Sequence, residues 1–439
     1  MKRYHQNCPK PLWLTLTALG LFVNAVFAAH DFNQTGAGTY NWSSAGNWNG
    51  GAPNGDGQDV NFTTSVSTAI AVTNASGVVN YLRISQGGAG SITVITSGSL
   101  DSTFGLQLNN NNILILANTS TISHGNNSFD NTTATLAVSN GALVVVNLGA
   151  NALQNKGTIT LVSGAGQNSD FNYGLSTGGA LNNSGTGTII KNGAGTGSFT
   201  GNHSGNNVSM VNNGTIIVNA GTLAINTADA FNDDGFNNTS TGRIFINAGA
   251  TLAINRTANA WTFDSDPDND GRIFLDGGSL TVLYAGAQAV DRGIQNNATI
   301  SGAGTLALKI AQASSGQTIA SNGVLNLFQT IGGNQQTFTS AGGQFGTMRA
   351  VSGGTLKING TVASGNAASW VINSGGTLDI GGNAVDLGAA YMPGSQLNGI
   401  VRVGSGGNFT ISAATGISGQ TLAQNGTFDF QAEIGRAHV

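Results

Sequence analysis

A short phrase recurs along the chain at intervals of roughly 28 residues, and this period constrains the fold more than any other feature. The copies are NNGTIIVNAGTLAINT (212–227), STGRIFINAGATLAINR (240–256) and NDGRIFLDGGSLTVLY (269–284). Two sets of apolar residues keep this spacing to within one position: Ile216, Ile244 and Ile273, then Leu223, Leu252 and Leu280. A unit of this length cannot bury its apolar side alone, so the units are predicted to stack.

Apolar residues alternate within each copy, which is typical of short β-strands. Ile216 and Val218 share one side of the first strand, and Leu223 and Ile225 share one side of the second. Alternation bounded by Gly and Asn predicts two strands of about four residues joined by a tight turn. With a longer polar loop, such a pair makes one coil of an all-β fold, a parallel β-solenoid.

The turn between the two strands carries Asn219, Asn247 and Asp276 in successive copies. In a stacked solenoid these residues would lie above one another. We therefore expect them to hydrogen-bond along the axis, as amide ladders do between stacked strands.

Weaker copies extend the pattern in both directions, and they cover residues 155–162, 185–193, 302–310, 353–360 and 375–382. Leu356 and Leu378 are closer together than the equivalent leucines of the central copies, so the later coils are expected to be shorter. The pattern predicts a cap and irregular strands over 29–140 and stacked coils over 141–432. Roughly 15 coils at a strand spacing of about 4.8 Å would give a rod about 70 Å long.

Composition excludes several classes of protein. Of 439 residues, 67 are Gly, 8% are charged, and the only glutamate is Glu433, which makes a largely helical fold implausible. An apolar fraction of 39% with clear periodicity argues against intrinsic disorder. The net charge is −4, and removing the leader cations Lys2, Arg3 and Lys10 leaves −7, so a nucleic-acid partner has no electrostatic basis.

Residues 1–28 read as a secretory signal peptide. A basic start precedes an uncharged apolar stretch over 12–27, and small residues around Ala28 form a cleavage site before Ala29. An uncleaved membrane anchor is the alternative, but the stretch is short and interrupted by polar residues. The single cysteine, Cys8, lies in this leader, so the exported chain would contain no disulfide. No other segment is expected to span a membrane as a helix. An extracellular or cell-surface location follows.

The C-terminal segment EIGRAHV (433–439) differs abruptly in composition from everything before it. It resembles a translated sequencing adaptor. We therefore expect a non-native tail on a fragment whose natural sequence continues beyond Ala432. A C-terminal β-barrel or sorting tail would then be missing from the sequence.

Residues 35–62, TGAGTYNWSSAGNWNGGAPNGDGQDVNF, combine paired tryptophans with a proline and an Asp-containing turn. Together with the GGTLxI phrases at 353–358 and 375–380, they resemble exported bacterial proteins with autotransporter-associated β-strand repeats. The resemblance touches most of the mature chain. It implies a right-handed parallel β-helix at or outside the cell surface, often attached through a C-terminal barrel or sorting tail.

Trp42 and Trp48 lie close to Tyr40 and Phe62 in the sequence, ahead of the repeats. The end of a solenoid exposes apolar side chains and strand edges, so we expect this aromatic group to cap the first coil. The functional alternative is a glycan contact, in which an indole ring stacks on the face of a sugar.

Four aspartates alternate in DSDPDNDGR (264–272): Asp264, Asp266, Asp268 and Asp270. Alternating carboxylates followed by Gly resemble a calcium-binding loop. Mutual repulsion between four close carboxylates also favours a bound cation. The bidentate glutamate of such a loop is missing, since Gly277 occupies its position, and a plain polar turn before a strand is the alternative. Calcium is thus the only cofactor that the sequence suggests.

A polysaccharide-active, pectin-lyase-like enzyme is the rival to a structural protein. Its site would need carboxylates as acid and base, often with arginine, on one face of the solenoid. The available parts are residues 233–234 (both Asp), the 264–270 cluster, Arg243, Arg256 and Arg272, of which Arg243 and Arg272 occupy equivalent positions in successive copies. Because acids are few, an enzyme is the weaker prediction, and no catalytic residue is assigned.

The sequence therefore predicts an exported, cysteine-free solenoid with a structural or adhesive function. Stacked coils would make a stiff stalk whose loops meet surfaces, and rows of Asn, Thr and Ser could hold surface or matrix polysaccharide through parallel hydrogen bonds.

Overall fold

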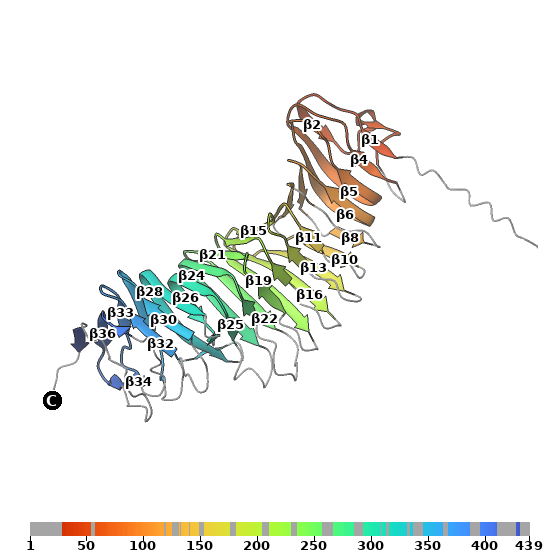
Figure 1. Cartoon of the computed structure of the whole chain (residues 1–439). Coiled ribbons are helices and arrows are strands. Elements are labelled where there is room, and N and C mark those ends of the chain that lie inside the picture. Colours follow the sequence, from red (N-terminus) through yellow and green to blue (C-terminus); the bar gives the residue numbers. More distant parts are fainter. Residues whose placement is uncertain are drawn as a thin grey trace, which may run out of the picture.

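The computed structural model describes residues 29–53, 58–117, 120–124, 131, 133–139, 141–148, 153–175, 181–203, 210–229, 235–256, 267–284, 293–308, 310–312, 316–331, 334–336, 346–362, 368–386, 396–410 and 427–430. Within these residues the protein is nearly all β, and its one helical element is a single 3-10 turn, η1 (Ala45–Asn47). Coils stack in chain order from one end of an elongated molecule to the other (Figure 1). This confirms the predicted parallel β-solenoid.

Each central coil contains three short strands, one more than the sequence predicted. One coil consists of β17 (Met210–Asn212), β18 (Thr215–Val218) and β19 (Thr222–Asp229). The three strands of the next coil pair with them in parallel: β20 (Phe236–Asn238), β21 (Arg243–Asn247) and β22 (Thr251–Arg256). The solenoid therefore has three faces, which we number in the order β18, β19 and β17.

The first face also contains β2 (Gly38–Asn41), β7 (Ile113–Leu116), β9 (Thr135–Val138), β12 (Thr158–Val162), β15 (Thr188–Asn192), β30 (Gly346–Ala350), β32 (Ala368–Ile372) and β35 (Gln396–Leu397). The second face contains β4 (Val60–Phe62), β8 (Ser120–His124), β10 (Leu143–Leu148), β13 (Asn168–Leu175), β16 (Thr196–His203), β31 (Gly354–Ile358), β33 (Thr377–Asp379), β36 (Ile400–Val403) and β38 (Thr427–Phe430). Five longer strands continue through both faces: β5 (Ile70–Ile84), β6 (Ile92–Leu108), β24 (Arg272–Tyr284), β26 (Thr299–Ala307) and β28 (Gln317–Ile331).

The third face is a sheet of seven strands, β11 (Leu153–Asn155), β14 (Leu181–Asn183), β17, β20, β23 (Asp268–Asn269), β25 (Ile294–Asn296) and β27 (Ile310–Gln312). Toward the C-terminus, β34 (Ala384–Asp386) and β37 (Asn408–Thr410) form a separate parallel pair. Two short strands pair in antiparallel fashion, β3 (Trp48–Asn49) with β1 (His30–Phe32) and β29 (Asn334–Gln336) with β28.

The stacking reaches further toward the N-terminus than the repeats indicated. In the part of 29–140 that the structure describes, β5 pairs in parallel with β6, and β6 with β7. The phrase is hard to see there because β5 and β6 run through the corner between the faces with several register shifts. The same backbone architecture therefore extends over both predicted regions.

The core consists of the residues that the alignment of repeats placed in equivalent positions. Ile216 pairs with Ile244, and Leu223 with Leu252, in register across the coils. All four side chains are buried, as are the equivalent Ile273 and Leu280. Each fully buried side chain of this size contributes roughly 1.5–3 kcal/mol to folding. Because each coil covers the apolar side of the next, the period of the sequence is the period of the core.

Glycines in the left-handed region make the corner between the first and second faces. Gly221 and Gly249 have φ values of 66° and 72° in successive coils. A residue with a Cβ atom adopts such a conformation at a cost, whereas Gly does so freely. The recurring Gly of the repeat therefore fixes where each coil turns.

A ladder of buried asparagines runs along the third face. In each link the side-chain amide Nδ2 of one Asn donates to the Oδ1 of the equivalent Asn in the next coil, at 2.6–2.7 Å. The members are Asn131, Asn155, Asn183, Asn212, Asn238, Asn269 and Asn296, and every one of them is fully buried. A buried amide is costly unless its donors and acceptors are satisfied. The ladder meets this requirement only when coils stack in register.

The exposed ladder that the sequence predicted is also present, although in part. Asn219 donates to Asn192 at 2.9 Å, and Asn247 donates to Asn219 at 2.8 Å. Asp276 lies opposite Asn247 as expected, but at a bulge where the register shifts. A carboxylate has no N–H to donate to Asn247, so this exposed ladder ends at Asn247 among the described residues.

An aromatic cluster closes the N-terminal end of the core. The rings of Phe32, Trp42, Trp48 and Phe62 pack with centroid distances of 5.2–6.2 Å. Trp42 donates its indole N–H to the carbonyl of Pro53 at 3.1 Å, and Trp48 donates to the carbonyl of Trp42 at 2.9 Å. The predicted N-terminal aromatic cap is therefore present.

One lysine occupies a core position. Lys191 stands in register between Leu161 and Val218 and is fully buried. Its Nζ donates to the carbonyl oxygens of Asn192 at 2.7 Å and Gly193 at 2.8 Å. Burial lowers the pKa of Lys191 from 10.5 to about 8, because desolvation disfavours the charged ammonium.

The stability of the protein is expected to rise with pH relative to Lys191→Met between about pH 8 and 10.5. In this window the unfolded chain binds more protons at Lys191 than the folded chain, so raising the pH favours folding, by at most about 1.4 kcal/mol per pH unit. Denaturant unfolding of both proteins across this range measures the difference. Lys156→Met, at an exposed position, controls for the loss of one lysine. Parallel curves for wild type and Lys191→Met would contradict the expectation.

Candidate functional site

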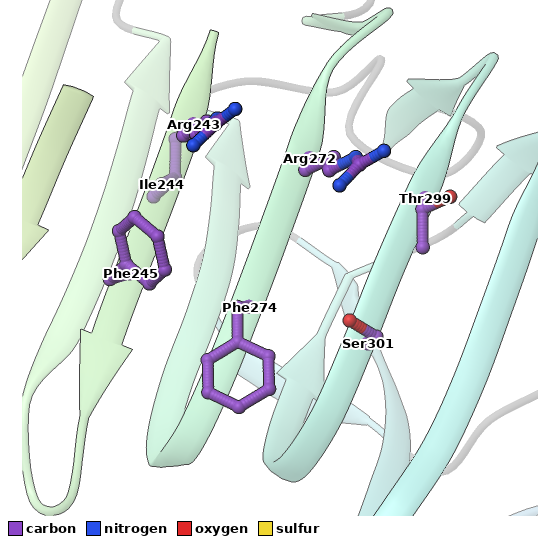
Figure 2. A pocket seen from close by; sticks show the side chains of 7 residues that line it. All are labelled: Arg243, Ile244, Phe245, Arg272, Phe274, Thr299 and Ser301. Atoms are coloured by element: carbon purple, nitrogen blue, oxygen red, sulfur yellow. The ribbon is translucent and has the colours of Figure 1, made fainter. Parts of the chain in front are cut away.

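The outer side of the first face carries a group of exposed arginine and phenylalanine side chains. Arg243 and Phe245 of β21 point outward on either side of the buried Ile244, and Arg272 and Phe274 of β24 do the same in the next coil, because side chains alternate along a strand. We name the Arg–Phe surface by the residues Arg243, Phe245, Arg272 and Phe274 with Thr299 and Ser301 of β26 (Figure 2).

The parallel register places like residues beside like residues. Arg243 lies opposite Arg272, and Phe245 lies opposite Phe274. The sequence predicted the arginine pair from its equivalent positions, and the register confirms it. On β26 both rows continue with hydroxyl side chains. Two chemically distinct rows therefore run along the solenoid axis, across the strands.

The two phenylalanines are among the most exposed large apolar side chains of the described residues. Phe245 is 36% exposed and Phe274 is 41% exposed, and their ring centroids are 6.3 Å apart. Ile190 and Ile217 continue the same row toward the N-terminus. Between the rows the surface is hollowed by a shallow depression of about 240 Å³. Exposed apolar groups in a contiguous row are typical of a contact surface.

The arginine row is positively charged and has no internal counter-ion in the described structure. Within the described part of the chain, neither Arg243 nor Arg272 forms an ion pair. Asp270 precedes Arg272 by two residues, but its carboxylate accepts a hydrogen bond from Asn297 at 2.8 Å. The exposed Asp276 lies on the same side of β24, about 13 Å along the strand from Arg272. Two adjacent cations would thus be stabilised by an anion placed between them.

The predicted glycan-contact residues, Trp42 and Trp48, lie in the cap. They are 2% and 4% exposed, and both indole N–H groups are bonded inside the protein. A ring buried to this degree has no free face on which a sugar can stack. The geometry therefore favours the capping alternative for this pair.

The predicted calcium ligands are described only in part. Asp264 and Asp266 lie outside the described residues. Asp268 and Asp270 are half-buried and flank the ladder residue Asn269 on β23, so both point to the outer side of the third face. Among the described residues no group of three or more acids, histidines or cysteines could hold a metal. The calcium site remains a prediction.

The other parts of the alternative enzyme site are not brought together in the described structure. The pair at 233–234 lies outside the described residues, and so does the side chain of Arg256, whose backbone pairs with Tyr284 on the second face. Arg243 and Arg272 lie on the first face. The two arginines are thus adjacent to each other, while the second-face position of Arg256 separates it from them.

Sequence reasoning missed Phe245 and Phe274 as surface residues. Both stand between inward-facing isoleucine or leucine residues, in the segments IFI and IFL, where an aromatic looks like part of the core. The period-two pattern contained the signal, because residues flanked by buried neighbours must point outward.

No family model matches this chain, and no curated protein or solved structure matches it either. The fold and the geometry of the Arg–Phe surface therefore carry the functional argument.

Proposed function

We propose that the protein is an exported structural and adhesive β-solenoid, displayed at the cell surface or outside the cell. The observation that carries this proposal is the stacking of coils in register, with buried asparagines joining successive coils of the central region along the axis. A ladder of this kind resists bending and local opening, because each coil satisfies the backbone and side-chain groups of its neighbours. Such a body suits a stiff spacer.

Export is supported by the sequence of residues 1–28, which lie outside the described residues. A mature chain without cysteine needs no oxidation step and no reducing compartment. Within the described residues no helix is long and apolar enough to cross a membrane. The repeat phrases resemble those of exported bacterial proteins with autotransporter-associated repeats, and a parallel β-solenoid is the fold that this resemblance implies.

Export is tested by expressing the full chain in a bacterium and sequencing the N-terminus of the extracellular or surface-bound product. We expect a mature chain that begins at Ala29 and that protease added to intact cells can reach. Small-angle scattering of the purified product is expected to give an elongated profile. A chain that keeps residues 1–28 and stays inside the cell would contradict the proposal.

The rival function, cleavage of a polysaccharide, is separated from adhesion by incubating the protein with a panel of polysaccharides and measuring new chain ends. Binding without new ends supports adhesion. Turnover that is lost in Asp268→Ala would instead establish an enzyme.

A further inference from the structure

Two features of the Arg–Phe surface are unexplained by a purely structural stalk: a pair of cations without counter-ions among the described residues, and a pair of exposed aromatic rings in register with them. We propose that this surface binds an acidic polysaccharide, one whose sugars carry carboxylates, along the solenoid axis and without cleaving it. The inference rests on the proposed adhesive function and specifies its ligand.

The arginine row favours a ligand that carries anionic groups, and carboxylates meet this requirement. Guanidinium groups are planar, permanently charged and able to donate two parallel hydrogen bonds to one carboxylate. Arg243 and Arg272 stand on neighbouring strands, whose backbones are about 4.8 Å apart. A polymer that lies along the axis therefore passes both guanidinium groups and can pair carboxylates with them.

The phenylalanine row supplies the second contact. Sugar rings have an apolar C–H face that packs on aromatic rings, and Phe245 and Phe274 are neighbours along the axis, with ring centroids 6.3 Å apart and ring planes inclined by 61°. Both rows run along the axis, so one straight chain contacts both (Figure 2). The hydroxyl groups of Thr299 and Ser301 line the hollow in the next coil and can hydrogen-bond to the sugar hydroxyls.

The shape of the surface fits a polymer that passes across it. The hollow of about 240 Å³ is smaller than the pockets that enclose small ligands. Its described lining contains arginine, phenylalanine, isoleucine and hydroxyl side chains and no carboxylate. Hydrolysis of a glycoside typically uses a carboxylic acid and a carboxylate on either side of the bond. The lining therefore supports retention of the polymer and not its hydrolysis.

A second copy of the chain fits this surface less well. A stable dimer buries about 800 Å² on each partner, whereas the apolar part of the surface is two rings that are 36% and 41% exposed. A symmetric contact that aligned the two arginine rows would also bring four cations together.

The test is a binding measurement with polygalacturonate and, as the matched ligand, its methyl-esterified form, which keeps the backbone and loses the charge. The full chain is expected to bind polygalacturonate, and to bind the ester roughly tenfold more weakly or worse. The double variant Arg243→Gln/Arg272→Gln is expected to lose roughly tenfold or more in affinity for the acid polymer only. Phe245→Ser/Phe274→Ser is expected to weaken binding of both polymers.

The control is Lys156→Gln/Lys357→Gln, which removes the same net charge from positions outside the Arg–Phe surface. It is expected to bind like wild type. Equal weakening in the control would mean a general charge effect and would overturn the site, as would full binding by the arginine variant. Sedimentation of the wild-type protein without polymer measures whether it forms a dimer. A dimer that dissociates in Phe245→Ser/Phe274→Ser would identify a second copy as the occupant of the surface and would overturn the proposal.

Failure of this inference is distinguishable from failure of the proposed function. A chain that is exported and elongated but ignores polygalacturonate retains its structural function and lacks this ligand. A chain that is retained inside the cell fails the proposed function, whatever it binds in vitro.

Discussion

Replacing Asn212 by Ala is expected to lower the free energy of unfolding by about 2–4 kcal/mol. The side chain accepts from Asn183 and donates to Asn238, both at 2.7 Å, and all three are fully buried. The substitution therefore leaves a donor on one neighbour and an acceptor on the other without partners in a site that water does not reach. Denaturant unfolding followed by circular dichroism measures the loss.

Asn219→Ala is the matched control, because it removes the central member of the exposed ladder in the same coil. Asn219 also bonds to asparagines on both sides, but its neighbours can exchange those bonds for water. A loss of less than about 1 kcal/mol is expected. Similar losses in the two variants would mean that burial of the ladder on the third face is not what makes it stabilising.

Replacing Trp48 by Ala is expected to destabilise the N-terminal cap by about 3–5 kcal/mol. The indole packs against Phe32, Trp42 and Phe62 and donates to the carbonyl of Trp42. Its loss opens a cavity at the point where the core would otherwise meet solvent. Hydrogen exchange resolved along the chain is expected to accelerate over the coils nearest the cap, because each coil is stabilised mainly by its neighbours.

Phe274→Ala is the control for Trp48→Ala. It also deletes an aromatic ring, but one that is 41% exposed, so we expect a change of less than about 1 kcal/mol. Unchanged exchange near the N-terminus in Trp48→Ala would show that the aromatic cluster does not seal the end of the solenoid.

The fold could be predicted because its period is repeated in the residues that fill the core. Ile216 and Ile244 are equivalent in the alignment of repeats, and the structure pairs them in register. The exposed amide ladder was predictable for the same reason, up to Asn247. The ladder does not continue to Asp276, because a carboxylate accepts hydrogen bonds but has no N–H to donate to Asn247.

The third strand of each coil could not be predicted in the same way. It is two or three residues long and turns few side chains inward, such as Met210 and Asn212, too few for a period to emerge. A signal existed, since Asn precedes Gly by two residues in Asn155, Asn212 and Asn269. In a chain so rich in Asn and Gly, that signal resembles any tight turn.

The arginine pair of the candidate site could be predicted from the sequence, whereas the exposed phenylalanine pair could not. Arg243 and Arg272 were recognised by equivalence, whereas the side that Phe245 faces depends on the register of the strand. A shift of one residue would bury the rings and expose the isoleucines. The neighbouring coils fix that register, and their influence is not contained in any one repeat.

The buried asparagine ladder also determines how this molecule can change in length. Each member accepts a side-chain amide N–H from the preceding coil and donates its own amide N–H to the following coil. A duplicated or deleted coil therefore presents matching ends on both sides, and the junction needs no new chemistry. Duplication or loss of the DNA that encodes whole coils can therefore change the length of the solenoid. A change by part of a coil would interrupt the ladder of asparagine hydrogen bonds.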